Sequence, residues 1–273
     1  PWVDSFKSRL DHEEDAIITN TQAIEMADNN TVLVIVDVNK PSITECPDLL
    51  KYCRSVVVLD HHRQGEEVVE NATLSYVEPY ASSACEMVAE ILQYVGDGIK
   101  VKGVEADCLY AGIVIDTNNF VAKAGVRTFE AAAFLRRSGA DVTRVRKMFR
   151  EDMEHCRIRT AIINKAEIYM DEFAISTFDG ENVSGATVVG AKAANALLNI
   201  QGIRGSFVLT ALQDCIYVSA RSIDELNVQV IMEKFGGGGH LTMAAAQLKD
   251  VSLSDAAEML KHTLRKMHED GDI

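Results

Sequence analysis

Two short apolar runs in this sequence each end in side chains that can bind a metal ion. Residues 31–37 (TVLVIVD) end in an aspartate, and residues 56–62 (VVVLDHH) end in Asp60, His61 and His62. Carboxylates mixed with imidazoles suit a divalent ion such as Mn²⁺, whereas a structural zinc site usually contains thiolates. These residues therefore predict a divalent-metal site.

A third carboxylate, Asp116, follows the apolar stretch AGIVI at the end of an expected helix. A single aspartate at such a place more commonly caps a helix or lies in a loop. However, Asp37, Asp60 and Asp116 occupy three comparable positions in one domain. Ligands of parallel α/β sheets bind beyond the carboxyl ends of the strands. We therefore expect these three side chains to converge on one site.

The elements that would position these residues alternate between strands and helices. The two β-branched runs lack polar alternation, which is typical of parallel strands buried on both faces. Together with the helices around them they predict an α/β layered domain over residues 1–145. Residues 146–168 are expected to form a helical connector, and residues 169–273 a smaller α+β domain. Strands are expected at 173–178, 206–212 and 215–222, and helices at 188–199 and 254–268.

A glycine-rich stretch, FGGGGHLTMAAA, lies in the smaller domain. It is expected to form a loop before His240 and a helical run after it. Without Cβ atoms, the backbone N–H groups of such a loop can approach a phosphate closely. Arg221 and Ser222, in VSARSID, strengthen the case because a guanidinium binds phosphate through two parallel hydrogen bonds.

Composition excludes several classes of protein. The 273 residues carry a formal net charge of −14, which repels extended nucleic acid. The six cysteines include no C-x-x-C pair, which indicates reduced cysteines of a cytosolic protein. Apolar runs fall short of the roughly 18 residues that span a membrane, so no membrane contact is expected of this chain.

Five stretches resemble motifs of the DHH/DHHA1 phosphoesterase superfamily. They are VIVDVNKP, LDHHRQGE, PYASSACE, GIVIDTNNF and GGGGH. The chain is most similar to the C-terminal catalytic module of the membrane-bound bacterial cyclic di-AMP phosphodiesterases. The resemblance covers nearly the whole chain. It implies a parallel-sheet DHH domain, a DHHA1 domain that binds substrate, two Mn²⁺ ions, and hydrolysis of cyclic di-AMP to pApA. It also implies a cytoplasmic module of a membrane-anchored protein.

The resemblance also implies roles for individual residues. Asp37 would bridge the two ions, and His61 and Asp116 would bind one of them. Asp60 would orient an imidazole, and His62 would donate to a phosphate oxygen at the transition state.

In the DHHA1 domain the resemblance implies that Arg221, Ser222 and the glycine loop hold the phosphate and base of the nucleotide. The glycine loop consists of Gly236, Gly237, Gly238 and Gly239, and His240, which follows it, is also expected to bind substrate. Ser82 and Ser83 are expected to cap the helix that begins at Ala84, with a contact to phosphate as an equal alternative.

One family motif is missing from this sequence. The superfamily's first motif, His-x-x-x-Asp-x-Asp, supplies most ligands of one ion, and no segment here has that form. We expect it to precede Pro1. Two alternatives stay open. One is a phosphatase for oligoribonucleotides or phosphoadenosine phosphate, and the other is a nucleotide-binding module without turnover. A homodimer through exposed helix faces is compatible with the pattern.

Overall fold

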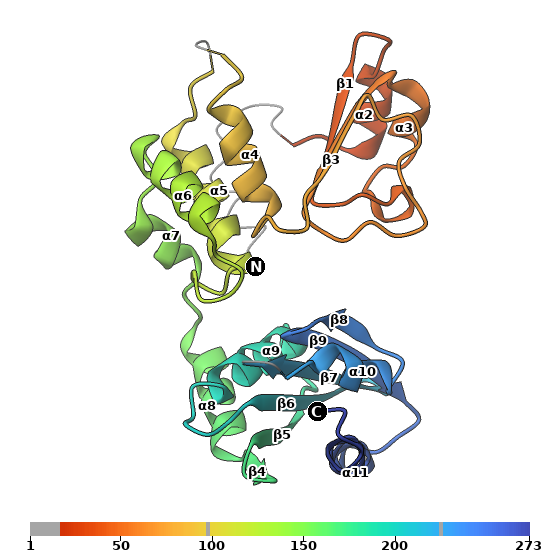
Figure 1. Cartoon of the computed structure of the whole chain (residues 1–273), viewed down its shortest axis with the longest axis vertical. Coiled ribbons are helices and arrows are strands. Elements are labelled where there is room, and N and C mark those ends of the chain that lie inside the picture. The colour runs from red at the N-terminus through yellow and green to blue at the C-terminus, as the bar shows by residue number, and fades with distance from the viewer. Residues whose placement is uncertain (1–16, 97–98, 224–225) are drawn as a thin grey trace. The chain divides into compact units, whose positions relative to one another are not determined.

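The computed structural model describes residues 17–96, 99–223 and 226–273, and the chain divides into two compact units, residues 1–150 and 151–273 (Figure 1). The division falls inside the segment expected to be a helical connector. Helix α7 (Val142–Met148) ends just before it, α8 (Met153–Asn164) begins just after it, and strand β4 starts at Glu167. Among the described residues, no helix has the length and apolar character needed to cross a membrane.

The N-terminal unit contains a three-stranded parallel sheet with the order β1-β2-β3. Its strands are β1 (Val32–Val36), β2 (Ser55–Asp60) and β3 (Leu74–Val77). Short β-branched runs pack well on a pleated surface, which explains why these segments form strands. The predicted parallel sheet is confirmed, and the carboxyl ends of all three strands lie at one edge.

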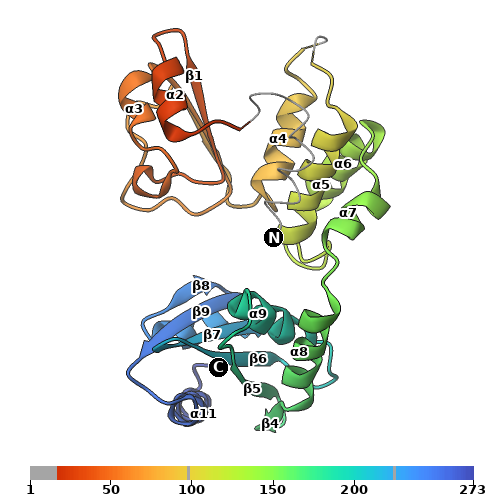
Figure 2. The same ribbon diagram turned by 180° about the vertical axis from the view of Figure 1, so that it is seen from behind.

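Burial of β1 on both faces was predicted and is wrong. Ile35 is buried with Val56 and Val58 of β2, but Val32, Val34 and Val36 are 42 to 59% exposed. Two helices lie next to this sheet (Figure 2): α2 (Asn20–Met26) precedes β1 in the chain, and α3 (Leu49–Tyr52) lies between β1 and β2. An apolar run shows that a strand has a buried face, but it does not show how many layers cover the sheet.

A group of helices completes the N-terminal unit. It comprises α4 (Ala84–Leu92), α5 (Gly103–Asp116), α6 (Val126–Arg137) and α7. Their core consists of small and aliphatic residues, among them Ala89, Ala106, Ile113 and Leu135. Gly112 allows α5 to approach α4 closely, because a Cβ there would lie 2.2 Å from the Sγ atom of Cys85. The helix that carries Asp116 is thereby held against the helix that follows β3.

The C-terminal unit contains a six-stranded sheet with the order β4-β5-β6-β7-β9-β8. The strands are β4 (Glu167–Tyr169), β5 (Phe173–Asp179), β6 (Gly205–Leu212), β7 (Cys215–Ser222), β8 (Gly238–His240) and β9 (Met243–Lys249). Strands β5 and β6 are parallel, and the other neighbouring pairs are antiparallel. This mixed sheet agrees with the predicted α+β class.

Helices pack on both faces of this sheet. Ala193 and Leu197 of α9 (Ala186–Leu197) and Ile162 of α8 share one core cluster with Val208 of β6. The other cluster joins α10 (Val228–Glu233) and α11 (Leu253–Asp270) to the opposite face, around Phe173 and Phe207.

The run after His240 was predicted to be helical and is instead strand β9. Its sequence, MAAAQLK, is rich in alanine, which favours helices in isolation. Here Ala244 and Ala246 are buried against the core, and the strand pairs with both β7 and β8. Packing of alternate residues in the sheet outweighs the intrinsic preference of alanine.

Candidate metal centre

Asp37 follows β1 directly and has an unusual backbone conformation. Its φ is 67°, in the left-handed region, while its N–H donates to the carbonyl of Leu59 at 2.9 Å. Aspartate tolerates this region better than most residues, but the conformation still costs energy. The strained backbone turns the carboxylate out of the strand, so that its side chain stays 59% exposed at the sheet edge.

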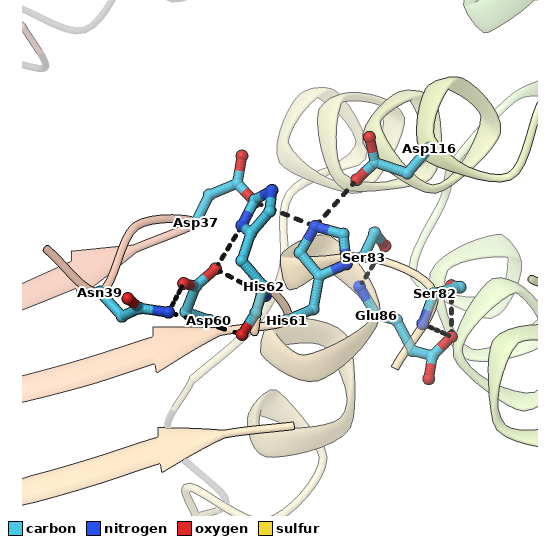
Figure 3. Close-up of polar contacts among 9 residues, drawn as sticks. All are labelled: Asp37, Asn39, Asp60, His61, His62, Ser82, Ser83, Glu86 and Asp116. Atoms are coloured by element: carbon cyan, nitrogen blue, oxygen red, sulfur yellow. Dashed lines mark hydrogen bonds and ion pairs between the residues drawn. The ribbon is translucent and has the colours of Figure 1, made fainter. Parts of the chain in front are cut away.

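Asp60, the last residue of β2, is fully buried and orients its neighbours. Its Oδ2 atom accepts a hydrogen bond from the Asn39 side-chain amide at 2.5 Å. Its Oδ1 atom lies 2.7 Å from Nδ1 of His62 and 3.2 Å from the backbone N of the same residue (Figure 3). The buried carboxylate therefore fixes the imidazole of His62.

His61 lies between two carboxylates that are far apart in the sequence. Its Nε2 atom is 3.3 Å from Oδ1 of Asp37 and 3.8 Å from Oδ2 of Asp116 (Figure 3). Ligand atoms that bind one ion at about 2.1 Å are separated from each other by about 3 to 4 Å. The structure thus places His61 at such a distance from each of the two carboxylates that were predicted to bind metal together with it.

The electrostatics of this cluster also suit a cation. The pKa of His61 is raised, chiefly by its hydrogen bond with Asp37, although burial opposes the rise. The pKa of Asp116 is raised, chiefly by burial and further by Asp37, while His61 acts in the opposite direction. Two carboxylates around one imidazole leave excess negative charge, which a divalent ion would neutralise.

The end of α5 adds to this negative field. Asp116 is the last residue of the helix, where unsatisfied carbonyl groups carry a partial negative charge. After it, Asn118, Asn119 and Phe120 all have positive φ values, and the N–H of Asn119 donates to the carbonyl of Val114. This tight turn ends the helix at Asp116.

Cys85 lies close to the cluster but does not resemble a ligand. Burial raises the pKa of its thiol to about 12, and Asp116 and Asp37 contribute to the rise. The group of possible metal ligands found among the described residues, Asp37, His61 and His62, does not include Cys85.

The group of potential ligands found among the described residues differs slightly from the predicted one. One ligand atom each from Asp37, His61 and His62 lies within 4.8 Å of the others. This group contains His62, for which the sequence predicted a contact with phosphate, in place of Asp116. The assignment of roles among these four residues stays a prediction.

Ser82 and Ser83 are both fully buried beside the cluster (Figure 3). Ser83 caps α4 by accepting from the N–H of Glu86 at 3.0 Å, and the Ser82 hydroxyl donates to the Glu86 carboxylate at 2.5 Å. The capping role is thus present, whereas burial leaves no exposed hydroxyl for a phosphate.

Sequence reasoning missed Asn39 and Glu86. Both are polar and almost completely buried, at 4% and 2% exposed. Asn39 follows two residues after Asp37, which was a usable signal for a supporting role. Glu86 gave none, because a glutamate near the start of a helix is usually exposed.

The residues predicted to bind substrate in the C-terminal unit have different environments. The Arg221 guanidinium is largely buried. Its Nη1 atom donates to the carbonyl of Ala220 at 2.8 Å, and its Nε atom has no hydrogen-bond partner among the described residues. Burial lowers the pKa of Arg221. The hydroxyl of Ser222 is buried and donates to the carbonyl of Leu226 at 2.7 Å, so it belongs to the fold.

The glycine run is partly strand, not loop. Gly238 and Gly239 belong to β8, and the N–H groups of Gly236 and Gly237 close the turn after α10 by donating to the carbonyls of Glu233 and Met232. These two donors are therefore used by the protein itself. His240, the last residue of β8, is exposed.

Comparison with protein families gives two matches. Residues 4–113 match the DHH family, N-terminal domain, and residues 173–269 match the DHHA1 domain. These correspond to the parallel-sheet unit and the mixed-sheet unit.

Among curated proteins, the cyclic-di-AMP phosphodiesterase PdeA of Listeria monocytogenes is 44% identical over 245 residues, which are 89% of this chain and 37% of that protein. The cyclic-di-AMP phosphodiesterase GdpP of Bacillus subtilis is 41% identical over 256 residues, which are 93% of this chain and 39% of the GdpP protein. The chain thus spans less than two fifths of either relative.

Among solved structures, an exopolyphosphatase-related protein from Bacteroides fragilis has a similar fold. The TM-score is 0.79 at 20% identity, and the match covers 94% of this chain and 76% of the other.

Proposed function

The chain belongs to the DHH family, with a DHHA1 domain after its DHH domain, and on this premise we propose that it hydrolyses cyclic di-AMP to linear pApA. Relatives at 41 and 44% identity are named cyclic-di-AMP phosphodiesterases. The observation that carries the proposal is the convergence of Asp37, His61 and Asp116 at the edge of the parallel sheet.

We propose divalent metal, with Mn²⁺ as the preferred ion, as the cofactor of this site. The fit rests on the mixed carboxylate and imidazole donors, on their spacing, and on the excess negative charge around His61. When bound, divalent ions would polarise a phosphoryl oxygen and lower the pKa of a water molecule. Asp37, His61 and Asp116 would hold them, and the family's first motif, which this sequence lacks, would supply the remaining ligands.

The other residues of the cluster would position the substrate. Because Nδ1 of His62 is bonded to buried Asp60, its Nε2 atom points away from that carboxylate. From there it would donate to a phosphoryl oxygen as negative charge develops on it. Asn39 would keep Asp60 in place, so that the imidazole approaches the phosphate in one orientation.

Arg221 would supply a positive charge for the anionic substrate. Its guanidinium is largely buried, and its Nε atom lacks a partner, an arrangement that is costly unless an anion or another acceptor binds there. A guanidinium binds phosphate well because its planar donors match two oxygens. We assign the phosphate contact to Arg221 and His240, and not to the buried hydroxyl of Ser222.

The test is hydrolysis of cyclic di-AMP with Mn²⁺, in this chain and in an N-terminally extended variant to which a His-x-x-x-Asp-x-Asp motif has been added. We expect pApA as the product and complete loss of activity in Asp37→Ala and His61→Ala, with unchanged circular dichroism spectra. Lys51→Ala, on the exposed surface of the same unit, is the matched control. Full turnover by either site variant would refute the assignment.

The substrate alternatives are ranked in the same assay. Phosphoadenosine phosphate and short oligoribonucleotides serve as competitors of cyclic di-AMP. If the inhibition constant of either competitor is lower than the KM of cyclic di-AMP, that competitor replaces cyclic di-AMP as the proposed substrate. Nucleotide binding without product, in the extended variant, would favour a binding module. The cytoplasmic location, attachment to a membrane-anchored protein and a homodimer stay predictions from the family resemblance.

A further inference from the structure

A β-turn at the carboxyl edge of the parallel sheet carries an almost fully exposed tyrosine. The N–H of Glu78 donates to the carbonyl of Asp60 at 2.8 Å, and the N–H of Ala81 donates to the carbonyl of Glu78 at 3.0 Å. Pro79 and Tyr80 are the two central residues of the turn that this second hydrogen bond closes. Proline favours the first of these positions because its ring fixes φ near the value that the turn needs. Tyr80 therefore lies at the tip of a turn after β3, next to the end of β2.

The turn adjoins the candidate metal centre on both of its sides. On one side it is bonded to Asp60, the buried carboxylate that orients His62. On the other side α4 begins, and the pKa of its residue Cys85 is raised chiefly by burial and further by the charges of Asp116 and Asp37. Consecutive Cα atoms are about 3.8 Å apart, so the Cα atom at the tip lies within about 8 Å of that of the residue bonded to Asp60.

The ring of Tyr80 makes almost no contact with the rest of the protein. The residue is 93% exposed, which is more than any other large apolar or aromatic side chain among the described residues. A tyrosine usually buries much of its ring, because removing its large apolar area from water is favourable. The ring therefore adds little to the stability of the fold and is free to pack against a bound molecule.

The backbone that carries this ring is, in contrast, held in place. Oε1 of Glu78 accepts a hydrogen bond from the N–H of Tyr80 at 3.2 Å, and Oε2 of Glu78 lies 3.9 Å from Nη1 of Arg127. The guanidinium of Arg127 donates twice to the carboxylate of Glu90 in α4, at 2.8 and 2.7 Å. An exposed ring on a backbone that is already ordered loses little entropy when a ligand packs against it.

A nucleobase is the ligand that suits this arrangement. Bases stack favourably on aromatic side chains, and they do so with little dependence on sequence because every base has a π-face. Phosphate groups and sugars have no such face. A nucleotide whose phosphate lies at the metal centre carries its base one ribose away, which is the direction in which the adjoining turn offers its ring.

We propose that the ring of Tyr80 stacks on one base of the substrate while the scissile phosphate lies at the cluster of Asp37, His61 and Asp116. The inference rests on the proposed function and deepens it, because it assigns a base contact to the N-terminal unit. The contact selects nucleotides over phosphate esters that lack a base. It does not distinguish adenine from guanine, since both present a π-face.

The experiment measures the binding of AMP and ribose 5-phosphate to the 273-residue chain by calorimetry, with Mn²⁺ present. We expect AMP to bind about tenfold more tightly, a factor within the range for stacking of one base on an aromatic side chain. Tyr80→Ala should remove most of this advantage, whereas Tyr80→Phe should keep it because the ring remains. Neither variant should change the unfolding temperature, because the side chain is exposed.

Tyr94 provides a matched control. It is 86% exposed and lies beyond the opposite end of α4, a helix of 9 residues that is about 14 Å long. Tyr94→Ala should bind both ligands as the parent does.

A tryptophan at each of these two positions reports stacking directly. In Tyr80→Trp, AMP should quench tryptophan fluorescence, and ribose 5-phosphate should not. The parent chain already contains one tryptophan, so its response to AMP is the reference. Tyr94→Trp should respond to AMP no more than the parent does.

The outcomes for the base contact and for the enzyme are distinguishable. The same preference for AMP in the parent and in Tyr80→Ala would overturn the contact, as would a parent that binds AMP no more tightly than ribose 5-phosphate. A preference that Tyr80→Ala removes, with no hydrolysis of cyclic di-AMP by the extended variant, would support the contact and refute the proposed function. Hydrolysis with a KM that Tyr80→Ala leaves unchanged would support the enzyme and refute the contact.

Discussion

Replacement of Asp60 by asparagine tests the network that supports His62. The buried carboxylate accepts three hydrogen bonds, one from the side chain of Asn39 and two from His62. An asparagine at this position has one acceptor oxygen and one amino group. The amino group must then face the amide of Asn39 or the Nδ1 atom of His62, and a donor is left without an acceptor in either case.

The expected cost follows from these contacts. A hydrogen bond to a charged group contributes about 1.5 to 3 kcal/mol to stability. A buried donor that is left without a partner costs about 1 to 3 kcal/mol more. We therefore expect Asp60→Asn to destabilise the N-terminal unit by about 3 to 5 kcal/mol. This is a large share of the total stability of a domain, which is about 5 to 15 kcal/mol.

A swapped pair separates charge from geometry. In Asn39→Asp with Asp60→Asn, the new amide at residue 60 donates to the carboxylate at residue 39 and still accepts from His62. We expect the double variant to recover all but about 1 kcal/mol of the loss, so the two substitutions should be strongly non-additive. Urea unfolding with hydrogen exchange of peptides from β1 and β2 gives the stability, and Mn²⁺ titration reports whether the cluster keeps its geometry.

The control is Asp48→Asn, which removes an exposed carboxylate paired with Lys51 and should leave the unfolding curve unchanged. A loss below about 1 kcal/mol for Asp60→Asn, or a swapped pair no more stable than the single variant, would contradict the reasoning.

Two further predictions concern other parts of the fold. Gly112→Ala should destabilise the N-terminal unit by about 1 to 3 kcal/mol, because the added Cβ would lie 2.2 Å from Sγ of Cys85. Adding Cys85→Ala to the same chain should recover most of this loss, as measured by urea unfolding. The pKa of His155 is raised, chiefly by its hydrogen bond to the carbonyl of Ser184 and further by Asp152. Protonated His155 therefore stabilises the folded protein fully below about pH 6.5, and this stabilisation is lost as the pH rises through the raised pKa of the folded state. His155→Gln should therefore destabilise the C-terminal unit more at about pH 5.5 than at about pH 8.5, and an equal effect at both would refute this.

Features carried by local pattern could be predicted from the sequence. The β-branched runs predicted β1 and β2 as parallel strands, and acidic or imidazole residues at their ends predicted where a site would lie. This works because parallel strands place their carboxyl ends at a common edge. Asp116 was expected at the same site because it follows the apolar AGIVI run, and the family resemblance added the expectation that it binds the same ion as His61.

Features decided by long-range packing could not be predicted. The helix-favouring run 243–249 is a strand because β7 and β8 lie on either side of it, a relation that its local sequence does not encode. The burial of Asn39 depends in the same way on Asp60, which lies 21 residues later. The exposure of Val32, Val34 and Val36 depends on which layers cover β1, and an apolar run is compatible with either arrangement.

The charge of the chain explains why the proposed binding groups must be local. A protein with a net charge of −14 repels a cyclic dinucleotide, whose two phosphates are both anionic. At physiological ionic strength this repulsion is screened beyond about 8 Å, so groups in direct contact with the substrate decide its affinity. Divalent cations held by Asp37 and His61 and a largely buried guanidinium at Arg221 would act at such short range. Burial strengthens the interaction of Arg221 with an anion, because little water competes with the anion for the guanidinium. The acidic composition that argued against long nucleic acid is therefore compatible with a small anionic substrate.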